Sequence, residues 1–313
     1  MAKPSGVKRS YVDRHLHLSG GTDPVLLWEL VNEGGLKTHA KNFWSFQASM
    51  SARPENVTNQ EQYLDIVHTI DTAQSSPGAV ERCTYNCFAS SYLNGCAELE
   101  LRWNPVKRTQ KGRIDLDRLI VAARSGMERA NATFGIEGSM LLCFGRDCTE
   151  AENEATWTMS LRYQNKGVAG IDTAGPETLP LSQKHPYLKH YYHAARARKQ
   201  TTTCHCAESL QDWTEDELFF VLEVLKPQRL GHGIQIHRYP KLMAKAAAQG
   251  IELEICLTSN LRTGVVRSHH DFRKILHRLE SASLRFTFHT DATFLLNTNI
   301  QKEHQLATSL RHA

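Results

Sequence analysis

The chain has 313 residues, 41% of them hydrophobic, which is enough to bury the core of one large α/β barrel or of two ordinary domains. It carries 37 basic and 33 acidic residues without a block of like charge, so its composition gives no support for a nucleic-acid or membrane-surface role. No apolar run approaches the roughly 20 residues of a membrane-spanning helix, and no signal-peptide pattern follows Met1, so we expect a soluble, cytoplasmic protein.

Short apolar runs, each followed by a segment with helical periodicity, recur along the chain. Strands are expected near Val12–Leu18, Ala97–Trp103, Ser139–Cys143, Val168–Asp172, Thr201–His205, Arg229–Gly231, Glu252–Cys256 and Arg285–Thr290. Helices are expected between them at Pro24–Asn32, Leu116–Thr133, Ala151–Gln164, Thr214–Leu225, Lys241–Gln249 and Asp271–Leu279. This alternation predicts an α/β protein of the TIM-type (β/α)8 barrel class. No Pro/Gly/Ser-rich linker divides residues 1–313, which we expect to form a single domain.

One stretch departs from this alternation. Between the first helix and the second strand, residues from about Leu36 to Glu81 are too many for a simple crossover and include Trp44, Phe46 and Met50. Loops that follow barrel strands build the active-site face, so this insertion is a candidate helical lid. A helical excursion that packs outside the barrel fits the same pattern.

The first expected strand carries two histidines. His15 and His17 are separated by one residue, so both rings project from the same face of the strand. Two imidazoles at a strand end can bind one divalent metal ion, most often zinc. The pair alone is weak evidence, because surface strands carry such pairs by chance.

Polar residues also stand at the ends of three other strands. The fifth strand ends in His205, with Glu208 three residues later, the sixth ends next to His232, and the eighth is followed by Asp291. In a barrel these ends share one face, which is where barrel enzymes place their active sites. Four strand ends that all supply metal ligands or acid–base groups therefore predict a catalytic metal site.

These strand ends belong to six ordered segments that resemble the motifs of the adenosine deaminase family, a part of the metal-dependent amidohydrolases. The segments are Asp13–Gly20, Gly170–Glu177, His205–Glu208, Gly231–Gly233, Thr258–Asn260 and Thr290–Asp291. The likeness extends from about residue 10 to residue 308. It implies a zinc hydrolase that removes an amino group from a purine-like ring and releases ammonia.

The resemblance implies a role for each matching residue. One zinc ion would be held by His15, His17, His205 and Asp291, leaving an open position for water, whose pKa the metal lowers. Glu208 would protonate the ring nitrogen beside the attacked carbon. His232 would orient or deprotonate the water, and Asp291 would accept a hydrogen bond from it. The backbone at Gly175 would lie against the purine edge, where a side chain would block the ring.

Related hydrolases offer a contrast. Many begin with a similar pair of histidines but hold two metals bridged by a carboxylated lysine at the end of the fourth strand. Here that strand, 168–172, contains no lysine. The sequence therefore favours one metal, and deamination over phosphotriester, lactam or hydantoin hydrolysis.

Two departures from the family pattern concern the substrate. Adenosine-specific members commonly carry an acid where Ser19 stands, contacting the sugar. Members commonly carry a second acid at the position of Ala292, contacting the imidazole edge of the purine, and a proline where Thr293 stands. Both changes remove substrate contacts and leave the reaction machinery intact.

A third departure lies at the end of the chain. After an expected helix at Ile300–Arg311 the sequence stops, whereas many relatives continue through further helices that brace the barrel. Either a partner subunit, such as a second copy in a homodimer, covers that surface, or the sequence is short.

Three functional hypotheses follow. The first is zinc-dependent deamination of an adenine-type nucleoside or base, with a small aminopurine-like substrate. The second is deamination of another amino-heterocycle, such as a pterin, a cytokinin-like adenine or an aminodeoxyfutalosine-like nucleoside. The third is a catalytically silent relative that binds a ligand without turnover, and the intact set of acid, base and ligands argues against it.

Overall fold

The computed structural model describes residues 10–53, 57 and 59–312. Eight parallel strands form one sheet in which each strand pairs with the next along the chain. The strands are β1 (Tyr11–His17), β2 (Cys96–Trp103), β3 (Glu137–Gly145), β4 (Val168–Ala174), β5 (Thr201–Cys206), β6 (Arg229–His232), β7 (Glu252–Ile255) and β8 (Arg285–Phe288). Just after β8, Asp291 exchanges backbone hydrogen bonds with β1. The Asp291 N–H donates to the His15 carbonyl, and the Asp291 carbonyl accepts a hydrogen bond from the His17 N–H. This contact brings the first and last strands together, so the sheet is a nearly closed barrel.

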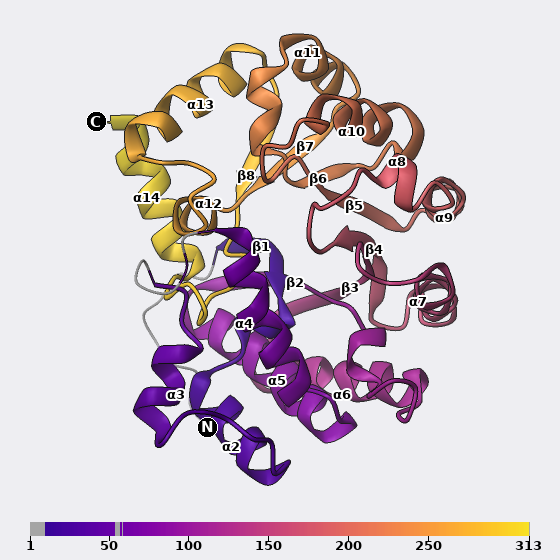
Figure 1. The fold of residues 1–313 in the computed structure, drawn as a ribbon, viewed down its shortest axis with the longest axis vertical. Helices are drawn as coiled ribbons and strands as arrows, with labels where there is room; N and C mark the ends of the chain where they lie inside the picture. Colours follow the sequence, from indigo (N-terminus) through magenta and orange to yellow (C-terminus); the bar gives the residue numbers. More distant parts are fainter. Residues whose placement is uncertain (1–9, 54–56, 58, 313) are drawn as a thin grey trace.

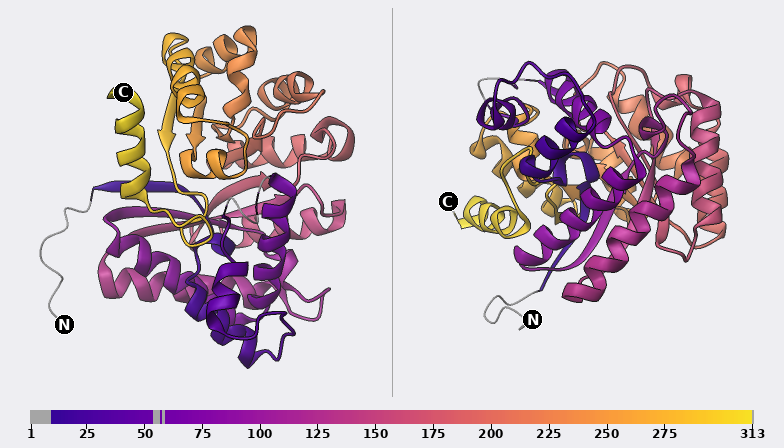
Figure 2. Two further views of the ribbon diagram at one scale, coloured as in Figure 1. Left: turned by 60° about the vertical axis from the view of Figure 1, so that its left-hand side comes forward. Right: turned by 90° about the horizontal axis from the view of Figure 1, so that it is seen from below.

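Helices surround the strands, as Figure 1 shows. The outer ring consists of α5 (Pro77–Leu93), α6 (Leu116–Phe134), α7 (Glu150–Arg162), α9 (Leu188–Ala197), α10 (Thr214–Phe220), α11 (Pro240–Ala248), α13 (His269–Ser281) and α14 (Ile300–His312). The further helical elements are α1 (Leu18–Gly21), α2 (Pro24–Glu33), α3 (Phe43–Ser49), α4 (Gln60–Ala73), α8 (Leu181–Lys184), α12 (Leu257–Arg262), the 3-10 turns η1 (Val106–Arg108) and η3 (Ile234–Arg238), and the π turn η2 (Val221–Leu225). Figure 2 shows the C-terminal helix α14, in yellow, beside the N-terminal end of β1, where Tyr11 contacts His304.

The sequence predictions of the barrel are confirmed: a strand is found at each of the eight expected places. The expected helix at Thr214–Leu225 is α10 continued by η2. Helix α5 has no counterpart among the expected helices. It begins at a clear signal, because the Ser76 side chain accepts a hydrogen bond from the Ala79 N–H and Pro77 occupies the first helical turn. Its mixed composition of Cys, Thr, Asn, Ser and Tyr hides the helical periodicity.

The inserted segment, residues 36–81, combines both roles considered for it. Its helix α3 packs outward, with Phe46 buried against Trp28 at a ring-centroid distance of 5.1 Å, while the neighbouring Trp44 is 74% exposed. Its helix α4 lies over the barrel mouth, where Gln60 and Tyr63 line the cavity described below. The segment is thus anchored by an apolar cluster that it shares with α2 and the loop after β8, and its helix α4 covers part of the cavity.

Charged side chains are buried inside the barrel. Arg102 on β2 donates to Asp172 on β4 and contacts Glu254 on β7, which are strands that do not pair with β2. Arg229 on β6 bonds Glu100 on β2 at 2.5 Å. Such contacts between strands that are not neighbours require the side chains to point into the barrel. Buried charges persist when they are paired and hydrogen-bonded, as these are.

Candidate metal and catalytic site

The site lies at the C-terminal ends of the barrel strands. His15 and His17 end β1, His205 lies on β5, His232 ends β6, and Asp291 follows β8. The backbone is left-handed at His232 (φ 56°) and Asp291 (φ 59°), a conformation that side chains other than glycine seldom adopt. Such outliers concentrate at functional sites, and here they occur at the last residue of β6 and three residues after β8.

Four side chains of types that can bind a metal ion converge at this rim. The Nε2 atoms of His17 and His205 are 3.1 Å apart, and the rings of His15 and His205 lie 4.6 Å apart between centroids. Asp291 Oδ1 is 3.8 Å from His15 Nε2 and 3.6 Å from His17 Nε2. The structure therefore brings together all four residues that the sequence predicted as ligands. Two overlapping groups could hold a metal ion, namely His15 with His17 and Asp291, and His15 with His205 and His232.

The histidines have the electrostatic state that metal ligands require. Burial lowers the pKa of His15 well below its ordinary value and that of His17 to about 3, so both rings are neutral at physiological pH. His15 Nε2 is buried without a hydrogen-bond partner. A buried polar atom without a partner is costly, and a metal cation at this point would satisfy it. The donor set therefore fits a divalent ion that prefers nitrogen ligands.

A second layer of side chains orients the ligands. His15 Nδ1 bonds Glu254 Oε2 at 2.8 Å, and His205 Nδ1 bonds Asp172 Oδ2 at 3.0 Å. Arg102 joins the two carboxylates, at 3.0 Å from Asp172 and 2.9 Å from Glu254. These contacts fix which ring nitrogen of each histidine faces the site. Although burial acts in the opposite direction, His205 and Arg102 hold the pKa of Asp172 well below its usual range.

Packing around the ligands also demands glycine. Gly231 lies on β6 beside His205, and a Cβ atom added there would be 2.8 Å from His205 Nδ1. That separation is closer than atoms of this kind approach, so any side chain at residue 231 would displace the ring. This explains why the expected Gly231–Gly233 motif begins with glycine.

Glu208 is a buried carboxyl group that lines the cavity beside His232 and Asp291. Burial, with added repulsion from Asp291 and Glu177, raises the pKa of Glu208 to about 8. Its Oε1 lies 3.8 Å from His232 Nε2, and its Oε2 accepts a hydrogen bond of 2.6 Å from Gln60. Glu208 is therefore largely protonated at neutral pH, as a general acid must be.

His232 and Asp291 are held by the Thr258–Asn260 motif. The side-chain amide of Asn260 bonds His232 Nδ1 at 3.2 Å, which leaves Nε2 of the ring facing Glu208. Ser259 Oγ donates to Asp291 Oδ2 at 2.7 Å, and Tyr63 OH donates to the same oxygen at 3.3 Å. The other oxygen of Asp291 remains directed towards the histidines.

The three predicted substrate contacts occupy different places. Ser19 and Gly175 line the cavity, together with His17, His205, Glu208, His232 and Asp291. Gly175 has a left-handed backbone, with φ of 120°. Ala292 is fully buried and is not among the lining residues. It packs so tightly on Gly20 that a Cβ atom added to Gly20 would be 2.2 Å from the Cβ of Ala292.

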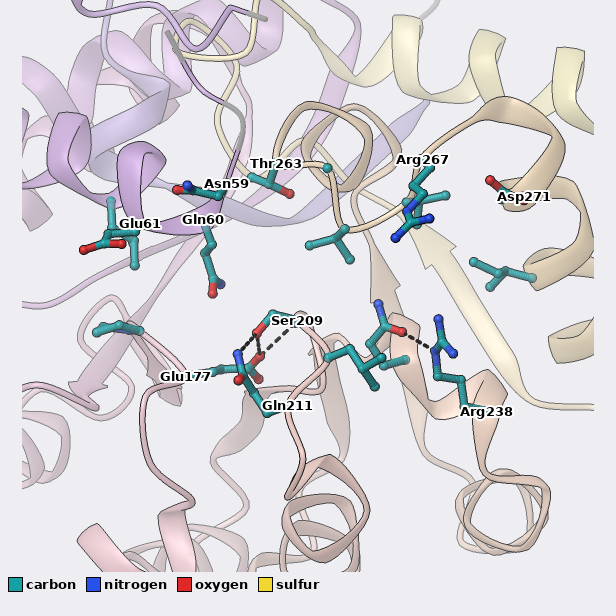
Figure 3. A pocket seen from close by; sticks show the side chains of 18 of the residues that line it. Asn59, Gln60, Glu61, Glu177, Ser209, Gln211, Arg238, Thr263, Arg267 and Asp271 are labelled. Carbon is teal, nitrogen blue, oxygen red and sulfur yellow. Dashed lines mark hydrogen bonds between the residues drawn. The ribbon is translucent and has the colours of Figure 1, made fainter.

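A wider groove of about 1230 Å³ adjoins the cavity and shares Gln60, Leu64 and His68 with it. Figure 3 shows Gln60 descending from α4 towards Glu177 and Ser209 on the opposite wall. Glu177 accepts hydrogen bonds from the Ser209 backbone at 2.8 Å and hydroxyl at 2.6 Å. This pairing braces the loop that carries Glu208.

The order of these elements and the composition of the site match a known family. The sequence model described as adenosine deaminase matches residues 11–313. The chain belongs to the adenosine deaminase family. An adenosine deaminase of Vibrio vulnificus (strain CMCP6) is 25% identical over 293 residues, which are 93% of this chain and 85% of the relative. The family and its relatives identify the chain as a hydrolase that acts on C–N bonds.

Solved structures of other proteins share the fold. An amidohydrolase from Burkholderia ambifaria with bound Zn superposes with a TM-score of 0.83 at 22% identity, covering 97% of this chain and 80% of that one. An Arabidopsis N6-mAMP deaminase superposes with a TM-score of 0.80 at 23% identity, covering 98% and 89%. Within the part of this chain that the structure describes, no helix has the length and apolar character needed to cross a membrane.

Proposed function

We propose that this protein binds one zinc ion and hydrolytically deaminates an adenine-type nucleoside or base, releasing ammonia. The observation that carries the proposal is the cavity that brings Glu208, whose pKa burial raises to about 8, together with His17, His205, His232 and Asp291. A proton donor and a set of metal ligands are the two components that hydrolysis of an aromatic C–N bond needs.

The metal would be held by His15, His17, His205 and Asp291. Their orientation by second-layer carboxylates, the buried and unpartnered His15 Nε2, and the zinc bound in the Burkholderia ambifaria relative support this assignment. When bound, zinc activates water for attack at neutral pH by lowering its pKa. Strand β4 supplies Asp172 and no lysine, which supports one metal in place of two.

The protein's own groups divide the proton transfers between them. Glu208 gives its proton to the ring nitrogen next to the carbon under attack, so that carbon becomes more electrophilic. His232 is neutral, because burial lowers its pKa, and can take a proton from the attacking water before returning it to the departing amine. Asn260 holds His232 in place, and Asp291 accepts a hydrogen bond that orients the water. Transition-state proton transfers of this kind typically contribute ~10²–10⁴-fold each.

A different amino-heterocycle is the second candidate substrate. Ala292 has no polar side-chain atom and lies beneath the cavity, so it cannot bind N7 of a purine. A ring without that nitrogen would lose no contact at this point. Pterins, which have no purine N7, therefore belong in the same assay, together with cytokinin-like adenines and aminodeoxyfutalosine-like nucleosides, which keep that nitrogen.

Ammonia release from zinc-loaded protein tests the proposal. Adenine, adenosine, their N6-substituted and phosphorylated forms, and an aminopterin would each be incubated with the protein. We expect ammonia, or the corresponding amine, from at least one adenine-type compound. Turnover of the pterin alone would favour the second candidate, and binding without release from any compound would identify a silent relative.

A further inference from the structure

A buried polar cluster forms one end of the catalytic cavity. Ser19 follows β1, Asp71 and Gln74 come from α4 and its C-cap, and Arg108 ends η1. Ser19 Oγ donates to Asp71 Oδ1 at 2.5 Å. One guanidinium nitrogen of Arg108 donates to Ser19 Oγ at 2.9 Å and to Asp71 Oδ1 and Gln74 Oε1, both at 2.7 Å. Of these four residues, Ser19, Asp71 and Arg108 line the cavity that contains Glu208.

The cluster leaves one acceptor unused. Asp71 Oδ1 receives both hydrogen bonds, whereas Oδ2 has no partner among the residues that the structure describes. Arg108 cannot offer its charge to a ligand in the same way, because it is 1% exposed, its second guanidinium nitrogen bonds the Asn104 carbonyl at 2.9 Å, and its Nε is buried. What the cluster presents to a ligand is therefore the free oxygen of a carboxylate.

The nearby lysine, Lys107, is also paired with a carboxylate. Lys107 lines the cavity beside Arg108, and its Nζ bonds Asp147 Oδ2 at 2.8 Å. These two are the lysine and arginine side chains among the described lining residues, and each already has a carboxylate partner. A phosphate group placed here would meet the Asp71 carboxylate without an unpaired lysine or arginine to offset the repulsion.

We propose that Asp71 is a specificity-determining residue whose Oδ2 accepts a hydrogen bond from a hydroxyl group on the substituent carried by the aminopurine. The preferred substrate class is then a nucleoside with a free sugar hydroxyl, over the free base and over the nucleoside monophosphate. A site built around a hydroxyl rejects analogues that lack it, because its buried polar group is left unpaired. This inference rests on the proposed function, since it takes the cavity to be the substrate site.

Equilibrium binding tests the role of Asp71 separately from the proposed deaminase activity. Zinc-loaded Glu208→Gln protein would be titrated with adenosine, its 2′-, 3′- and 5′-deoxy analogues, adenine and adenosine monophosphate. We expect adenosine to bind most tightly and at least one deoxy analogue to bind roughly 10- to 100-fold more weakly, as for loss of a hydrogen bond to a charged acceptor. Equal or tighter binding of the monophosphate, equal binding of all deoxy analogues, or no binding of adenosine would overturn the assignment. Ammonia release by the parent protein tests the proposed function separately.

Substitution then assigns the effect to Asp71. Asp71→Asn keeps the oxygen that bonds Ser19 and Arg108 but replaces the free acceptor by a donor, so the penalty for the affected deoxy analogue should disappear. Asp65→Asn, an exposed carboxylate on the same helix, should retain the penalty. The paired exchange Ser19→Asp with Asp71→Ser returns a carboxylate next to Arg108 and should restore the preference even if Asp71→Asn folds poorly. A penalty that persists in folded Asp71→Asn, or a pair that restores nothing, contradicts the proposal.

Discussion

Gln60 donates a hydrogen bond of 2.6 Å to the carboxyl oxygen Oε2 of Glu208. The inserted helix α4 therefore contacts the candidate acid directly, 148 residues away along the chain. Through Tyr63 the same helix also contacts Asp291. A segment outside the barrel repeat thus supplies contacts to two of the proposed catalytic groups, which makes its position part of the active site.

Activity should depend on the protonation of Glu208. Because burial raises the pKa of this carboxyl to about 8, the acid is protonated below that pH and loses its proton above it. We expect kcat/KM to fall about tenfold per pH unit above pH 8. Gln60→Met removes a donor that favours the ionised form, so the alkaline limb should move to higher pH. Thr69→Ala, an exposed change on α4, is the control, and a flat profile through this range would contradict the assignment.

Removing the acid should separate turnover from metal binding. Glu208→Gln keeps the shape of the side chain and touches none of the proposed ligands, so metal content should be unchanged while kcat falls by ~10²–10⁴-fold. Metal analysis alongside a single-turnover assay checks both. Glu61→Gln, an exposed carboxylate on α4, should behave like the parent. Near-parental turnover by Glu208→Gln would show that another group is the acid.

The number of metal ions is a separate prediction. Purified protein should contain close to one zinc or substitute divalent ion per chain, as measured by elemental mass spectrometry. His205→Ala should lose metal and activity together, whereas His232→Ala should keep the metal and lose activity. Loss of metal from both His205→Ala and His232→Ala would favour the alternative ligand group, His15 with His205 and His232. Two ions per chain, both needed for activity, would exclude a mononuclear site.

The second layer should control metal affinity. Asp172→Asn removes the charge that His205 and Arg102 share, and loss of such a partner typically weakens metal binding by ~10–100-fold. Competition with a chelator measures the change. Glu137→Gln, at the exposed start of β3, should leave the affinity unaltered. An unchanged dissociation constant in Asp172→Asn would mean that the Asp172 charge is not needed to orient His205.

Because residue 292 is alanine, we expect the protein to discriminate only weakly between substrates with and without purine N7. Loss of a hydrogen bond to a charged partner costs about 1–3 kcal/mol, but Ala292 cannot form such a bond with N7, so a substrate without N7 loses no contact there. Adenosine and 7-deazaadenosine should therefore differ by less than about tenfold in kcat/KM, or ~1.4 kcal/mol. A preference of several hundredfold for adenosine would show that another side chain, such as Thr293 or one from the inserted segment, contacts N7.

Much of the site could be predicted because barrel geometry converts sequence position into spatial position. Residues at the ends of parallel strands share one rim, so the sequence alone is enough to place His15, His205, His232 and Asp291 together. Charged residues within a buried strand, such as Glu100 and Arg102 on β2, are a further signal of contacts inside the barrel. A charge in such a place needs a buried partner of opposite sign.

The contacts made by the inserted segment could not be predicted in the same way. The interpretation of Ser19 as a lost acidic contact is incomplete, because Asp71 supplies a carboxylate at 2.5 Å from its hydroxyl. The two residues are 52 positions apart and are joined only by how α4 docks on the barrel. That docking depends on apolar packing between helices, for which local periodicity gives no register.

Deamination in water labelled with ¹⁸O, using zinc-loaded protein and the best aminopurine substrate, tests the central claim most directly. The account predicts one ammonia and one product molecule per turnover, with a single labelled oxygen at the carbon that carried the amine. The same reaction with Glu208→Gln should give neither above ~1% of the parental rate. Product without labelled oxygen, or labelled product formed equally well without Glu208, would contradict it.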